Sequence, residues 1–96
     1  MRTMIARVWR GVAKDAGAYL RHLDGNVVPE LKKIAGYRGY RVLRREQEIL
    51  VMTLWESMDS VRAFAGADPE KAVVEPEARA VLAEFDDFVR HYEVER

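Results

Sequence analysis

The stretch Val51–Gly66 constrains the fold of this chain most, because it predicts a strand, a helix cap and a helix in direct succession. Hydrophobic residues alternate up to Trp55, as they do on a β-strand. Ser57 is placed to cap a helix over residues 58–66, which the glycine at its end closes. Trp55 and Phe64 therefore come from a strand end and from the helix that follows. Such a pair can form the wall of an apolar pocket, although aromatics at this spacing are also typical of core packing.

The composition is that of a small folded protein without net charge. At 96 residues the chain has the length of one domain, residues 1–96, and a chain this short gains stability by dimerising. Its 16 basic and 16 acidic residues cancel, so no net positive field attracts nucleic acid or an acidic membrane. No run of about 18 apolar residues predicts a membrane span, and the N-terminus lacks the apolar core of a signal peptide. We therefore expect a cytoplasmic protein without nucleic-acid or membrane partners.

The residue types exclude several kinds of chemistry. The chain has no cysteine, which excludes disulfides, thiolate nucleophiles and cysteine-bound metals. His22 and His91 lie far apart, and neither has a second histidine at metal-ligand spacing. Asp86 and Asp87 are adjacent, so on a strand their carboxylates point to opposite faces. No glycine-rich phosphate loop is present. We expect neither a metal site nor a cofactor.

Hydrophobic periodicity predicts the order strand, helix, strand, strand, helix, strand. A helix over 13–24 is broken at Gly25-Asn26 and followed by a short helix from Pro29 to Gly36. Gly11 ends the first strand, and two cap-then-proline patterns predict two short helical pieces within 68–84. The predicted strands cover residues 2–10, 37–46, 48–55 and 85–95.

This order predicts an α+β fold of the ferredoxin-like βαββαβ type, a four-stranded antiparallel sheet with its helices on one face. The strands carry hydrophobic residues on both faces. On the first strand, for example, Ile5 and Trp9 point one way and Met4 and Val8 the other. The face without helices therefore also needs cover, and the simplest cover is the sheet of a second copy. We expect a homodimer.

Four stretches of the sequence carry a resemblance to a known family: Met4–Arg10 on the first strand, Leu54–Ser57 at the end of the third, Ala63–Gly66 in the next helix and His91–Val94 on the last strand. With them the chain resembles the antibiotic biosynthesis monooxygenase family, the dimeric α+β barrels, over nearly its whole length. The resemblance implies a pocket between the helices and the sheet of each subunit, and one of several activities. Some members oxygenate aromatic polyketides and quinols without metal or flavin, and others degrade haem.

Three departures count against haem degradation. The haem-degrading branch of the family has a first-strand asparagine, a helix tryptophan and a nearby histidine. The first strand here offers Arg7 and Trp9 instead. Phe64 stands at the helix position, and Val74 lies where the histidine is wanted.

Oxygenation without a cofactor requires an ionised substrate that can itself pass an electron to oxygen. The protein must supply an apolar cavity, a base or cation that favours the anion, and exclusion of water. Arg7, between hydrophobic neighbours, is the candidate cation; alternatively it lies at the dimer interface, paired with an acidic residue. His91 is the candidate base, or else a structural histidine. The acidic partners open to Arg7 in the second interpretation are Asp86, Asp87 and Glu93.

Four aromatic residues are candidates for substrate binding. Trp9 offers an indole N–H and a stacking ring, or marks a partly exposed strand end. Tyr19, inside the hydrophobic stripe of the first helix, either aims its hydroxyl inward or packs in the core. Trp55 and Phe64 are the candidate walls. His22 lies at the edge of the stripe, where a surface position is expected unless the helix borders the pocket.

Two functions from different classes follow. The first is a cofactor-free monooxygenase-like dimer acting on a small aromatic or quinone-type molecule, with Arg7 and His91 in the chemistry. The second is a non-catalytic dimer of the same fold that binds a small apolar or aromatic ligand or serves as a stress-related module. The second hypothesis rests on the absence of a strong catalytic constellation in the sequence.

Overall fold

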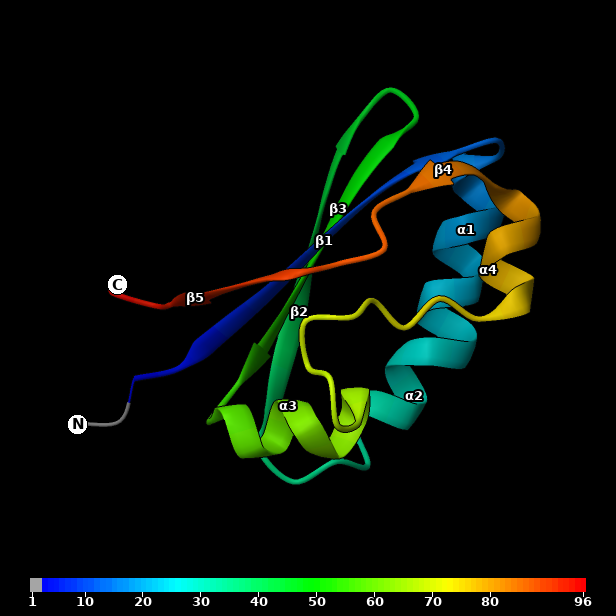
Figure 1. Cartoon of the computed structure of the whole chain (residues 1–96). Helices are drawn as coiled ribbons and strands as arrows, with labels where there is room; N and C mark the ends of the chain where they lie inside the picture. The colour runs from blue at the N-terminus through cyan, green and yellow to red at the C-terminus, as the bar shows by residue number, and fades with distance from the viewer. Residues whose placement is uncertain (1–2) are drawn as a thin grey trace.

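A computed structural model describes residues 3–96, and it is a twisted antiparallel sheet with helices packed on one face (Figure 1). The central strands lie in the order β2-β3-β1, and both β4 and β5 pair with β1 beyond it. The predicted ferredoxin-like α+β fold is confirmed. Arg2, the expected start of the first strand, lies outside the described residues. The strands are β1 (Ile5–Ala13), β2 (Tyr37–Arg45), β3 (Glu48–Trp55), β4 (Leu82–Phe85) and β5 (Arg90–Glu93).

The predicted last strand, over 85–95, is two short strands rather than one. Between them the chain leaves β1 and pairs with the segment before α4 instead. Ala72 N donates to Asp87 O at 2.8 Å, and Val89 N donates to Glu70 O at 2.8 Å. The fourth strand position of the sheet is therefore filled by β4 and β5 in turn.

The first helical region is continuous, so the predicted break at Gly25-Asn26 is wrong. The two residues lie in a π-helical turn, in which Val28 N donates to Leu23 O five residues back. Asp15 caps the region, because its side chain accepts from Ala18 N at 3.0 Å. The three elements of this region are α1 (Ala16–His22), η1 (Leu23–Val27) and α2 (Val28–Leu31).

The later helices match the sequence only in part. Ser57 caps α3 (Met58–Ala65) as predicted, by accepting from Ser60 N at 3.3 Å, and Gly66 ends it. Within 68–84 the only helix is α4 (Pro76–Val81). The expected piece at residues 68–70 is a turn, because the chain there is drawn into a β-bridge between Lys71 and Phe88.

Gly11 does not end β1, contrary to the prediction from the sequence. It pairs with Ile49 on one side and Phe85 on the other. Its role is spatial, because the Trp9 indole lies over it: a Cβ here would stand 2.5 Å from Trp9 Cη2. The glycine thus lets the strand continue beneath a large aromatic side chain.

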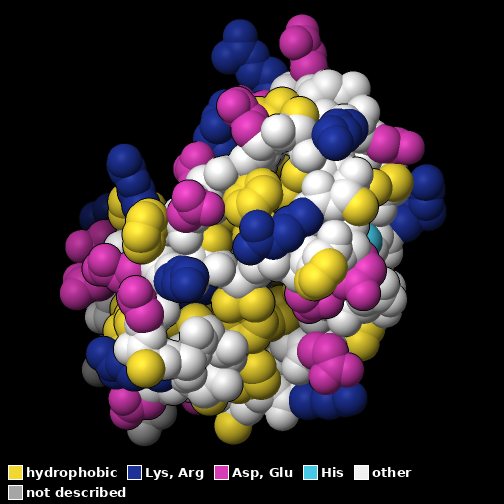
Figure 2. Space-filling model, turned by 45° about the vertical axis from the view of Figure 1, so that its right-hand side comes forward, with side chains coloured by type: hydrophobic (Ala, Val, Ile, Leu, Met, Phe, Trp, Pro, Cys, Tyr) yellow, Lys and Arg dark blue, Asp and Glu magenta, His cyan; other side chains and the backbone are white. Residues whose placement is uncertain are grey.

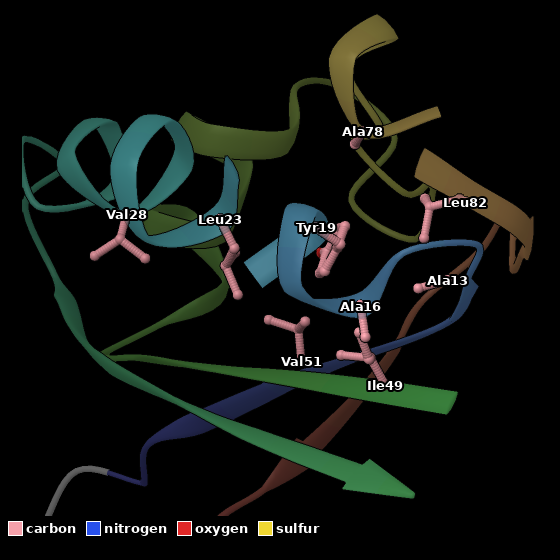
Figure 3. Packing of buried hydrophobic residues seen from close by; sticks show 9 residues of the cluster. All are labelled: Ala13, Ala16, Tyr19, Leu23, Val28, Ile49, Val51, Ala78 and Leu82. Atoms are coloured by element: carbon pink, nitrogen blue, oxygen red, sulfur yellow. The ribbon is translucent and has the colours of Figure 1, made fainter. Parts of the chain in front are cut away.

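The pairing register assigns side chains to the two faces of the sheet. Arg7 lies opposite Thr53 and Trp9 opposite Val51, all on the face under the helices. Tyr19 and Leu23 project from the helical layer toward this face, where they meet Val51 (Figure 3). Residues one step along the strands occupy the other face, which no element of the described chain covers. No helix in residues 3–96 is long and apolar enough to cross a membrane.

Candidate functional site

A cavity of about 70 Å³ lies between the sheet and the helical layer. Its sheet wall comes from β1 and β3, and its helical wall from α1, η1, α2, α3 and α4. Residues 73–75 cover one side. The lining is mostly hydrophobic, and hydrophobic side chains lie between charged ones on the face that carries the helices (Figure 2). The volume is well below the roughly 300–1,000 Å³ of common ligand pockets.

Arg7 projects from the middle of β1 into the sheet wall and is only 4% exposed. Its guanidinium donates to Pro69 O, and to Lys71 O at 3.0 Å. It also lies over the Phe64 ring, 5.6 Å from its centroid. Burial lowers the pKa of Arg7 to about 10, so the side chain stays cationic at neutral pH.

No carboxylate within residues 3–96 forms an ion pair with Arg7. Of the acidic partners that the sequence left open, Asp86 faces Arg10, at 3.9 Å, as one of three carboxylates around that arginine. Buried charges are usually paired. Arg7 is therefore a buried cation whose partners in the described chain are two carbonyl oxygens, an aromatic ring and His91.

His91 lies directly across from Arg7 in the register of β5 and β1. Its Nε2 is 3.2 Å from Arg7 Nη1. Since the guanidinium can only donate, Nε2 accepts and the ring hydrogen sits on Nδ1. Burial, together with the charge of Arg7, lowers the pKa of His91, against an opposing effect of Glu70. The ring stands beside Arg7 and does not line the cavity.

Trp9 and Tyr19 form a stacked pair in the cavity wall. Their ring centroids are 5.7 Å apart at an interplanar angle of 27°. The Trp9 N–H donates to Asp86 O at 3.0 Å, so the ring rather than the N–H faces the cavity. Burial raises the pKa of Tyr19 far above its usual value, which keeps the hydroxyl protonated. That hydroxyl has no hydrogen-bond partner in the described part of the chain.

Trp55 and Phe64 form a second stacked pair, and only Phe64 lines the cavity. Trp55 is fully buried behind it, with its N–H donating to Thr53 Oγ1 at 2.9 Å. Tyr37 meets the same indole edge-on at 5.3 Å. Trp55 therefore supports the wall from behind.

His22 lines the cavity, contrary to the surface position expected from the sequence. Its Nε2 is buried and has no hydrogen-bond partner in residues 3–96. Its Nδ1 lies 3.1 Å from Asn26 Nδ2, one helical turn away. The position of His22 three residues after Tyr19 was a usable signal, because residues i and i+3 share a helix face.

Within the described residues, no three or more of histidine, cysteine, aspartate and glutamate cluster as metal ligands would. The polar residues that line the cavity are Arg7 and Thr53 on the sheet side, Tyr19 and His22 on the helical side and Glu75 in the covering segment, and His91 lies beside Arg7. This arrangement can hold a small, mostly apolar molecule that carries an anionic oxygen.

The overall fold is shared with solved structures that span nearly the whole chain. SnoaB, a cofactor-independent oxygenase from Streptomyces nogalater, is 13% identical; the match covers 98% of this chain and 93% of SnoaB, with a TM-score of 0.65. A monooxygenase from the gene ActVA-Orf6 of Streptomyces coelicolor, solved with the ligand nanaomycin D, is 14% identical, with coverage of 97% and 87% and a TM-score of 0.65. At such identities the likeness shows the fold alone.

A third similar structure has a different activity. The heme-degrading protein Rv3592 from Mycobacterium tuberculosis is 20% identical, with coverage of 100% of this chain and 96% of that protein and a TM-score of 0.67. No curated protein sequence matches the chain. The family model described as antibiotic biosynthesis monooxygenase matches residues 1–76. The chain therefore belongs to the antibiotic biosynthesis monooxygenase family.

Proposed function

We propose that this protein is a cofactor-independent, monooxygenase-like dimer that acts on a small aromatic or quinone-type molecule with an ionised oxygen facing Arg7. The observation that carries the proposal is the buried guanidinium in the wall of an apolar cavity, with no acidic partner in the described chain. A ligand oxyanion would supply the missing counter-charge.

Arg7 and the apolar lining are assigned separate tasks. The guanidinium stabilises a phenolate or enolate, the form of the substrate that passes an electron to oxygen. The ring of Phe64, over which Arg7 lies, and the stacked Trp9 and Tyr19 hold the flat ring of the substrate and exclude water. His91 holds Arg7 through its Nε2, so we assign it a positioning role rather than that of a base.

The size of the cavity favours the smallest members of this substrate class. About 70 Å³ is tight even for one substituted ring, so entry of a ligand requires the covering residues to shift. Those residues follow the Pro69 and Lys71 carbonyls that Arg7 holds. The same guanidinium thus contacts both the segment that leads into the cover and the proposed site of the oxyanion.

The lining of the cavity also favours a second function, a non-catalytic binding module of the same fold. His91, the candidate base, does not line the cavity, and the raised pKa of Tyr19 keeps its hydroxyl protonated. In that case the protein would hold its small aromatic ligand without turning it over.

A second copy is proposed to cover the outer face of the sheet. Val8 pairs with Met52 there, and Leu43 with Leu50. Leu43 is 52% exposed and Tyr92 50% exposed. Such a hydrophobic face is typical of an interface. Light scattering of the wild type should give twice the monomer mass, and Met52→Glu should give the monomer; a monomeric wild type at micromolar concentration contradicts the dimer.

The functional test compares Arg7→Met with Arg62→Met, an exposed arginine on α3 that serves as the matched control. Wild type and control should consume oxygen with small phenols or quinols in the presence of a metal chelator. Arg7→Met should bind these molecules about 10- to 100-fold more weakly, the value of a hydrogen bond to a charged group. Binding without oxygen uptake would favour the binding module. Neither binding nor uptake by the wild type would refute both functions.

Haem fits this site poorly. Arg7, Phe64 and Val74 stand where the haem-degrading branch has other residues, and a volume of about 70 Å³ is far too small for a porphyrin. Titration of the protein with haem should therefore produce no shift of the Soret band.

A further inference from the structure

His22 is the polar group at the cavity that the proposed chemistry leaves unused. Its Nε2 is buried and has no partner in the described chain, although the ring lines the cavity. A buried polar atom without a hydrogen bond costs about 1–3 kcal/mol and needs an explanation. A ligand atom that completes the hydrogen bond is the direct one.

The contact with Asn26 indicates which form of the ring faces the cavity. Asn26 Nδ2 is an amide nitrogen and donates to His22 Nδ1 across 3.1 Å. Since Nδ1 accepts this bond, the ring hydrogen sits on Nε2, the buried nitrogen. His22 therefore presents a donor to the cavity. His91 is the opposite case, because its Nε2 accepts from Arg7.

His22 and Arg7 belong to different walls of the cavity. Arg7 comes from β1 in the sheet, and His22 comes from the end of α1 in the helical layer. Tyr19 lies on the same helix face as His22, one turn earlier, and its hydroxyl is also without a partner in the described residues. A flat ligand held between the layers would meet a cation on one side and hydrogen-bond donors on the other.

We propose that His22 is a specificity-determining residue that donates from Nε2 to a second oxygen of the ligand, on the side away from Arg7. This inference rests on the proposed function, which supplies the first, ionised oxygen. It defines the ligand class more closely: a small ring with one ionised oxygen and, across the ring, an acceptor oxygen such as a carbonyl. Asn26 is the positioning residue that keeps the hydrogen on Nε2.

The test measures binding of two matched phenols, 4-hydroxybenzaldehyde and 4-vinylphenol, by titration calorimetry. They share the phenol and differ in the carbonyl oxygen opposite it. The wild type should prefer the aldehyde, and His22→Phe should reduce that preference on the order of 5- to 10-fold, the value of one hydrogen bond. Asn26→Ala, an exposed change, should reduce it less, and Arg21→Ala on the same helix should leave it unchanged.

A second measurement needs no ligand. Nitrogen-15 spectra of the imidazole rings should show the Nε2–H tautomer for His22 and the Nδ1–H tautomer for His91. An Nδ1–H tautomer at His22 would overturn the inference. So would an equal preference for the aldehyde in wild type and His22→Phe, with both phenols still bound through Arg7, and that result leaves the proposed function standing. Failure of the wild type to bind either phenol would overturn both proposals.

Discussion

Two stacked aromatic pairs lie under the helices, with almost the same geometry and very different surroundings. Trp55 and Phe64 are 5.8 Å apart at 22°, and Trp9 and Tyr19 are 5.7 Å apart at 27°. Trp55 lies in a fully buried cluster with Leu31 and Val61, and its N–H is satisfied by Thr53. The other pair borders the cavity, and the Tyr19 hydroxyl has no partner in the described residues.

The difference shows that an aromatic pair does not by itself identify a site. In the first pair only Phe64 reaches the cavity, and Trp55 is enclosed by its neighbours, so the contribution of Trp55 is to stability. The Trp9 pair borders the cavity beside the buried charge of Arg7, and its Tyr19 hydroxyl is available to hydrogen-bond a ligand. Open volume beside the rings, rather than ring geometry, separates the two, because the Trp55 cluster also has a hydroxyl without a partner in the described residues, that of Tyr37.

The largest effect should come from Trp55→Ala. Removing a fully buried tryptophan from a solid cluster leaves a cavity and should lower the free energy of unfolding by about 3–5 kcal/mol. Chemical denaturation followed by circular dichroism measures it.

Trp9→Ala is the matched control for Trp55→Ala. It removes the same ring from a partly exposed position beside the cavity, so it should lower the free energy of unfolding by less than Trp55→Ala does. Equal losses in the two variants would remove the distinction between the pairs.

Gly11→Ala should disturb the Trp9 pair alone. The new Cβ would stand 2.5 Å from Trp9 Cη2, so the indole must move off Tyr19, at a cost of about 1–3 kcal/mol. The near-ultraviolet circular dichroism signal of the stacked rings should be weaker in Gly11→Ala, and the free energy of unfolding should be lower.

Gly25→Ala is the control for this glycine, because a Cβ at residue 25 meets nothing within 4 Å. It should stabilise the protein by about 0.4–1 kcal/mol. Loss of stability in Gly25→Ala, or none in Gly11→Ala, would show that the contact with Trp9 is not the cause.

The third prediction compares the polar groups of the two pairs. Thr53→Val removes the acceptor of the buried Trp55 N–H and should cost about 1–3 kcal/mol. Tyr19→Phe removes a hydroxyl without a partner in the described chain and should change stability by less than about 0.5 kcal/mol. A clear loss in Tyr19→Phe would mean that its hydroxyl is already bonded, which contradicts its availability to a ligand.

The sequence was a good guide to the fold and to one wall of the site. Alternation and caps predicted β2, β3 and α3 nearly residue for residue, because these elements follow local rules. Arg7, Trp9, Tyr19 and Phe64 were named from the sequence, and all line one cavity. Four local features were missed, because each depends on a partner distant in the chain or on an uncommon turn.

Those features show where local rules fail. From the sequence alone Gly11 is interpreted as the end of a strand, because the sequence does not reveal that the Trp9 indole lies above it. The split of β4 from β5 depends on the pairing of residues 87–89 with the segment before α4, and the same pairing accompanies the turn that replaces a helix at residues 68–70. The π-helical turn left no mark in the sequence beyond Gly25-Asn26, and the position of His22 in the cavity wall was missed although its spacing from Tyr19 indicated it.

The last and smallest effect concerns His91, which lies beside Arg7. The Arg7 side chain contacts both aromatic pairs, because it lies over Phe64 and lines the cavity together with Tyr19. Burial and Arg7 lower the pKa of His91 in the folded state below the ordinary 6.5. As the pH falls through about 6.5, His91 binds a proton in the unfolded chain but not yet in the folded protein. The contribution of His91 to stability is therefore complete above that pH and is lost as the pH falls toward the folded pKa.

His91→Gln keeps an acceptor for Arg7 without titrating. The difference in unfolding free energy between wild type and His91→Gln should therefore be constant above about pH 7 and turn against the wild type below about pH 6.5. A difference that stays constant down to about pH 5 would mean that neither burial nor Arg7 lowers the pKa of His91.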